Sequence, residues 1–61
     1  MDIYALIEKF EASDKRSERV VAAIMDDLND RRGVKQELQS CDDDVLEEMF
    51  NTLADIVEHQ R

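Results

Sequence analysis

The chain is 61 residues long and acidic, with sixteen aspartate and glutamate residues against eight lysine and arginine residues and a formal net charge of −8. A chain of this length has room for one hydrophobic core, so we expect a single domain over residues 1–61. The excess of negative charge disfavours attraction to nucleic acid or to an anionic membrane, so neither is an expected partner.

The composition favours helix over strand throughout the chain. There is no proline and only one glycine, and residues of high helix propensity recur. No segment shows the alternation of apolar and polar residues that a half-buried strand requires. We therefore predict an all-α protein.

The first predicted helix covers about residues 2–12. Its apolar side chains recur at the spacing of one helix face and are Ile3, Leu6, Ile7 and Phe10. Asp2 precedes them and is placed to cap the helix.

Two interpretations of residues 2–31 are open, because no large apolar side chain occurs between Glu11 and Arg19. One is a single long helix whose heptad-spaced side is formed by Ile3, Ile7, Phe10, Asp14, Ser17, Val21, Ile24 and Leu28. The other ends the first helix near Ala12 and starts a second at Ser13 or Asp14, which are both good N-cap residues. We favour the break, because a buried seam poorly tolerates two successive polar positions.

The second helix is then predicted over about residues 14–31. Its apolar face consists of Val20, Val21, Ile24, Met25 and Leu28. Gly33 is expected to end this helix, since glycine is the residue most common just after a helix C-terminus. Val34 and Leu38, four positions apart, predict a short helical connector over residues 34–40.

The last segment has the clearest helical pattern and predicts a helix over about residues 42–59. The apolar side chains form a continuous stripe of Val45, Leu46, Met49, Phe50, Leu53, Ile56 and Val57. Asp42, Asp43 and Asp44 make an acidic first turn, and Asp44 with Glu47 has the spacing of a capping box.

These helices predict a helical hairpin or three-helix unit whose apolar faces close a common core. The expected core or dimer interface consists of Ile3, Ile7, Phe10, Val21, Ile24, Leu28, Leu46, Met49, Phe50, Leu53, Ile56 and Val57. So small a core gains stability from a partner chain, and the last stripe is wide enough to contact two neighbours. We therefore expect a homodimer that forms a dimeric helical bundle.

The residues that could carry chemistry are few, and none is expected to form a catalytic, cofactor or metal site. Cys41 lies just before the last helix, but the only histidine, His59, is about 27 Å further along at 1.5 Å per residue. Three consecutive aspartates on a helix point in different directions and cannot all hold one cation. We therefore expect a protein that is not an enzyme.

Charged side chains suggest two further roles. Asp44, Glu48, Asp55 and Glu58 are expected to form an acidic face on the outward side of the last helix, where a row of carboxylates can imitate a phosphate backbone. Lys15, Arg16 and Arg19 form a basic cluster that is expected to pair with the acidic last helix of the same or a neighbouring chain. Direct nucleic-acid binding would need these bases and Arg31 and Arg32 on one face of a dimer.

Taken whole, the acidic, proline-free chain that opens MDIYALIEKF and ends NTLADIVEHQR resembles the small early-region accessory proteins of lambda-like phages. The resemblance lies in size and character and carries over no individual residue. It implies a small helical protein, often dimeric, that binds and redirects a host protein. The expected function is thus regulatory protein binding through a helical surface, and the alternative is an acidic nucleic-acid mimic that inhibits a DNA-binding protein.

The expected location is the cytoplasm, or the host cytoplasm if a phage encodes the chain. The longest apolar run, Val20 to Met25, is far shorter than the roughly 20 residues of a membrane span. The opening residues reach Glu8 without the basic start and apolar stretch of a secretory signal.

Overall fold

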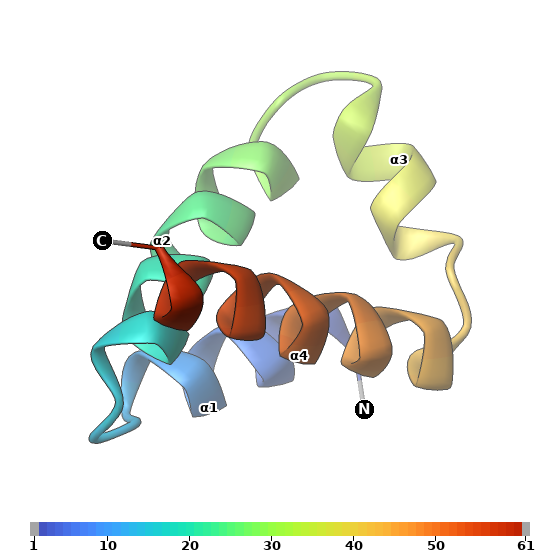
Figure 1. Ribbon diagram of the computed structural model, residues 1–61. Helices are drawn as coiled ribbons and strands as arrows, with labels where there is room; N and C mark the ends of the chain where they lie inside the picture. The colour runs from blue at the N-terminus through green and yellow to red at the C-terminus, as the bar shows by residue number, and fades with distance from the viewer. Residues whose placement is uncertain (1, 61) are drawn as a thin grey trace.

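The computed structural model describes residues 2–60, and within that range the chain is helical with no strand. Its four helices are α1 (Ile3–Glu11), α2 (Arg16–Asn29), α3 (Val34–Gln39) and α4 (Asp43–His59), which pack against one another (Figure 1). The all-α prediction is confirmed. None of the helices within residues 2–60 combines the length and the hydropathy that a membrane span needs.

The chain breaks between α1 and α2, so the interpretation with one long helix is wrong. The Asp2 Oδ1 atom accepts a hydrogen bond from the Ala5 backbone N–H at 2.9 Å and caps α1 as predicted. Lys15, rather than Ser13 or Asp14, occupies the N-cap position of α2. Ser13 instead organises the turn, because its hydroxyl oxygen accepts from the Lys15 backbone N–H at 3.0 Å and the hydroxyl donates to Glu18.

The sequence predicted that Gly33 ends α2, but in the structure Gly33 begins α3. Helix α2 stops at Asn29 with Asp30 as its C-cap, and Gly33 occupies the N-cap position of α3 with a φ of +91°. Only glycine adopts such a φ without strain, so this residue allows the chain to turn from α2 into α3.

The start of α4 also differs in detail from the prediction. Asp42 is the N-cap residue and makes no side-chain capping bond, and the Asp44 carboxylate accepts from the backbone N–H of Val45 at 3.0 Å. The expected pairing of Asp44 with Glu47 in a capping box is therefore wrong. The acidic first turn itself is present and faces the positive end of the helix dipole.

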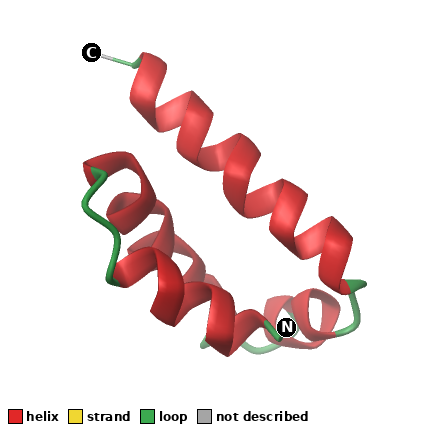
Figure 2. Ribbon diagram, turned by 90° about the horizontal axis from the view of Figure 1, so that it is seen from below, coloured by secondary structure: helices red, strands yellow, loops and turns green. Residues whose placement is uncertain are grey.

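Helix α2 lies at the centre of the molecule. It packs extensively against both α1 and α4, which touch each other over fewer residues. Figure 2 shows α4 running across the pair formed by α1 and α2. The end of α3 reaches back to the start of α1, where the Gln39 side-chain amide donates to the Tyr4 hydroxyl at 3.3 Å.

The core lies between α1, α2 and α4, with one contribution from α3. Phe10 and Phe50 meet edge to face, with ring centroids 5.1 Å apart and planes at 82°, an arrangement that stabilises by about 1 kcal/mol beyond area burial. The buried apolar residues are Ile3, Leu6, Ile7, Phe10, Val21, Ala22, Met25, Leu38, Leu46, Phe50 and Ala54.

Two residues of the predicted core lie outside it: Ile24 is 47% exposed and Ile56 is 51% exposed. The buried side of α2 is centred on Val21, Ala22 and Met25, and Ile24 is about 100° around the helix from Met25. Ile56 is likewise about 120° around α4 from Phe50. Of the other predicted core residues, six are buried and four, Leu28, Met49, Leu53 and Val57, are half-buried against the core.

Among residues 2–60, two polar residues are buried in the core, and the favoured interpretation of the sequence placed neither of them there. Ser17 and Asn29 are 8% and 4% exposed, both on α2. The Asn29 Oδ1 atom has no hydrogen-bond partner among the described residues, and an unpaired buried acceptor reduces stability.

Candidate protein-binding surface

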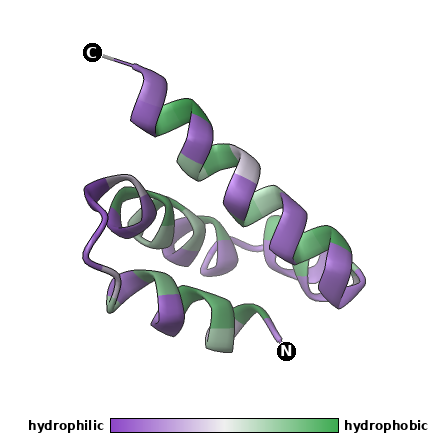
Figure 3. Ribbon diagram, turned by 60° about the horizontal axis from the view of Figure 1, so that its bottom comes forward, coloured by the Kyte–Doolittle hydropathy of each residue, from purple (hydrophilic) through white to green (hydrophobic). Residues whose placement is uncertain are grey.

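Helix α4 carries apolar side chains on a side that the rest of the chain leaves uncovered. Val45 is 45% exposed and Ile56 is 51% exposed. At about 100° per residue, Val45, Met49 and Ile56 fall within about 40° of one another around the helix axis. Met49 is half-buried between the two exposed residues. We call these three residues the exposed stripe. Figure 3 shows hydrophobic segments recurring along α4 between hydrophilic ones.

A shallow hollow opens beside the exposed stripe. Val45 and Met49 of the stripe line it together with Glu48, Thr52 and Leu53, and its volume is about 290 Å³. Met49 and Leu53 also pack against the buried core, so the floor of the hollow is held in place by the fold. The hollow is therefore an apolar depression with a carboxylate at its edge.

Acidic side chains run along α4 next to the exposed stripe. Asp44, Glu48 and Asp55 are all exposed and fall within about 40° of one another around the axis. We call these three residues the acidic row. Within residues 2–60, no lysine or arginine forms an ion pair with any of them, and the bases of that range lie on other elements.

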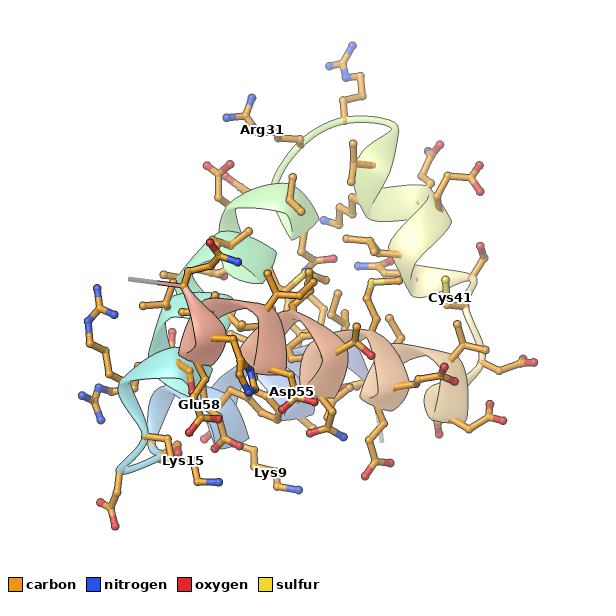
Figure 4. All side chains as sticks on the ribbon, in the orientation of Figure 1. Lys9, Lys15, Arg31, Cys41, Asp55 and Glu58 are labelled. Carbon is orange, nitrogen blue, oxygen red and sulfur yellow. The ribbon has the colours of Figure 1, made fainter. Side chains whose placement is uncertain are left out.

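Glu58, the fourth residue of the predicted acidic face, lies beside basic side chains. It lines a separate hollow of about 290 Å³ with Lys15, Arg16, Ser17, Val57 and Gln60. Figure 4 shows Glu58 near the end of α4 on the same side of the view as Lys15. The basic cluster thus reduces the negative potential around Glu58, while the acidic row lies outside this hollow.

The predicted basic residues lie near the two ends of α2. The Arg19 guanidinium donates to the Ser13 carbonyl at 2.8 Å, and Arg31 pairs with Asp27 at 2.9 Å. Lys15 and Arg31 flank opposite ends of α2 (Figure 4). Within residues 2–60, the basic cluster makes no ion pair with α4.

Cys41 and His59 stand at opposite ends of α4. The Cys41 thiol is half-buried and donates to the Glu37 carbonyl, with Sγ and O 3.3 Å apart. The His59 Nδ1 atom lies 2.7 Å from the Asp55 carbonyl oxygen. Among residues 2–60, no three side chains of the metal-ligating types come together, those of Asp42, Asp43 and Asp44 included.

The division of the last apolar stripe into two sides was missed from the sequence. Leu46, Phe50 and Ala54, spaced by four residues, mark the buried side, while Val45 and Ile56 are exposed and Met49 is half-buried between them. An alanine in line with two large buried side chains was the available signal, because a helix that packs closely on another favours a small residue at the contact. Comparisons of this chain with protein-family models, with curated proteins and with solved structures found no match.

Proposed function

We propose that this chain is a non-enzymatic interaction protein that binds a regulatory or host protein through the exposed side of α4. One observation carries the proposal: the exposed stripe and the acidic row lie side by side on one helix. Removing Val45 and Ile56 from water on binding is favourable, at about 25 cal/mol per Å² of apolar surface. An apolar strip rimmed by polar groups is typical of protein interaction sites.

The phage resemblance is compatible with this proposal and adds a setting for it. In that setting the partner is a protein of the host cytoplasm, and binding redirects its activity. The homodimer expected from the sequence would cover the same exposed stripe, so a second copy of the chain is the main competitor for this surface.

Capture from the native cell tests the proposed function. The purified chain, tagged at its N-terminus, is compared with the double variant Val45→Ser/Ile56→Ser and with Val34→Thr, which changes an exposed valine on α3. The wild type and Val34→Thr are expected to enrich the same protein, and the double variant is expected to lose it. Equal capture by the double variant would place the binding surface elsewhere.

The second candidate function is nucleic-acid mimicry, and the acidic row favours it, since its three carboxylates are exposed without an ion-pair partner in residues 2–60. A mimic binds a DNA-binding protein mainly through charge, so its affinity falls steeply with salt. Charge reversal by Glu48→Lys/Asp55→Lys would abolish such binding even with the exposed stripe intact. Loss of capture in this variant, with full capture by Val45→Ser/Ile56→Ser, would identify the mimic.

A further inference from the structure

The charge of α4 restricts what can cover the exposed stripe. Between Asp43 and His59 the helix holds six carboxylates and neither lysine nor arginine. Apolar contact with the stripe brings a partner beside Glu48 and Asp55, which are one helix turn or less from it. Like charges there would repel the partner and opposite charges would attract it.

Charge argues against a second copy as the occupant of the exposed stripe. A second copy that docks α4 on α4 would bring six more carboxylates to the same place, on a chain of formal charge −8. Repulsion between the two acidic helices would oppose this contact, whereas a cationic partner would be attracted.

The form of the surface favours a helix over an extended segment. No strand edge exists within residues 2–60 to which a peptide could add. The exposed stripe instead offers side-chain contacts at Val45, Met49 and Ile56, with the hollow beside Met49 open to one apolar side chain. Spacings of four and seven residues, one and two helix turns, suit contact with the apolar side of an amphipathic helix.

We infer that the partner presents a cationic amphipathic helix, whose apolar side covers the exposed stripe and whose lysine or arginine side chains reach Glu48, Asp55 and Asp44. The inference rests on the proposed function and specifies the chemistry of its partner. Apolar burial supplies the affinity, and the acidic row selects the charge and orientation of the incoming helix.

Synthetic helical peptides with one identical leucine-rich side test the inference. The first carries lysine and arginine beside that side, the second carries glutamate there, and the third has the composition of the first in scrambled order. Titration calorimetry with the full chain is expected to show binding of the first peptide at least about tenfold tighter than binding of the other two. Raising the salt from about 0.05 M to about 0.5 M is expected to reduce the difference in affinity between the cationic peptide and the other two.

Paired variants measure separately how much the exposed stripe and the acidic row contribute to binding. Val45→Ser/Ile56→Ser should weaken binding of the cationic peptide by about tenfold or more, and Glu48→Gln/Asp55→Asn by roughly three- to tenfold. The matched controls are Val34→Thr for the apolar change and Glu8→Gln/Glu11→Gln for the charge change, all at exposed positions on other helices. Circular dichroism monitors the fold of each variant.

Each contrary result has a separate meaning. Equal binding of the cationic and acidic peptides, or an equal loss in both charge variants, would overturn the charge selection. If no peptide binds, the inference of a helical partner would be overturned. The proposed function would still be tested separately by the capture experiment. Sedimentation of the chain as a dimer that Ile56→Ser dissociates would assign the exposed stripe to a second copy.

Discussion

Single residues determine how well this small core is packed, and Asn29 is its weakest point. Asn29 is the last residue of α2 and its side chain is buried. The side-chain oxygen, Oδ1, has no hydrogen-bond partner among the described residues. A buried acceptor that leaves water without finding a donor reduces stability. The burial of Asn29 could not be predicted, because this residue follows Leu28, the last predicted apolar position of that helix.

Replacing Asn29 by leucine is therefore expected to stabilise the fold. Leucine has the same number and branching of side-chain heavy atoms as asparagine and no polar atom, so Asn29→Leu should raise the free energy of unfolding by about 1 kcal/mol. Urea denaturation followed by circular dichroism measures the change, with Asn51→Leu on the exposed side of α4 as the control. A lower midpoint for Asn29→Leu would show that its amide makes an interaction that stabilises the fold.

Among the elements, the helices could be predicted well but their ends could not. Periodic apolar residues indicated all four helical segments, because that pattern is local. The position of the N-cap of α2 depends on the hydrogen bonds of Ser13 to Lys15 and Glu18. The sequence does not show these bonds, so it could not decide which of the polar residues at 13–15 is the N-cap. Gly33 could be read as the end of one helix or the start of the next, and the positive φ at α3 decides it.

The turn between α2 and α3 depends on the backbone freedom of Gly33. A Cβ atom there would meet nothing within 4 Å, so Gly33→Ala tests conformation alone. The variant is expected to lose about 1–2 kcal/mol of stability in urea denaturation, because an L-residue is strained at this φ. A synthetic chain with D-alanine at position 33 should equal or exceed the wild type, and equal stability of the L- and D-alanine forms would contradict the explanation.

The two sides of α4 are expected to respond very differently to mutation. Phe50 is fully buried against Phe10, so Phe50→Ala should lose about 3–5 kcal/mol, which is enough to unfold a domain of this size. Ile56→Ser should change stability by no more than about 0.5 kcal/mol, because the side chain already contacts water. Thermal unfolding compares the two, and a large loss for Ile56→Ser would mean that the isoleucine is buried in solution.

The whole molecule has more accessible surface than a typical monomer of its mass. The accessible area is 4537 Å² for 7.1 kDa, against roughly 4100 Å² for a typical monomer. Sequence periodicity identified α4 as the widest apolar stripe. It could not show which part is exposed, since that depends on where α2 and α1 lie against α4. The predicted acidic face contained the three exposed residues of the acidic row. It could not show that its fourth residue, Glu58, has Lys15 and Arg16 as neighbours, because these come from a distant part of the chain.

Salt is expected to act in opposite directions on the two competing occupants of the exposed stripe. A cationic helix should bind less tightly as salt rises, because screening weakens its attraction to Glu48 and Asp55. Self-association of two acidic α4 helices should instead strengthen, because screening weakens their repulsion. Analytical ultracentrifugation of the chain alone, across the same salt range as the peptide titration, shows whether self-association strengthens with salt while peptide binding weakens. Self-association that weakens with salt would point to a dimer through another, charge-complementary face.

The most direct test of the binding surface is to titrate the cationic amphipathic peptide into the isotope-labelled chain and follow its backbone amide signals by NMR. We expect shifts concentrated along α4 at Val45, Glu48, Met49, Thr52 and Ile56, with little change in the outward side of α1 around Glu8. Shifts concentrated in the Lys15–Glu58 hollow or on α1, with α4 unchanged from Val45 to Ile56, would contradict it.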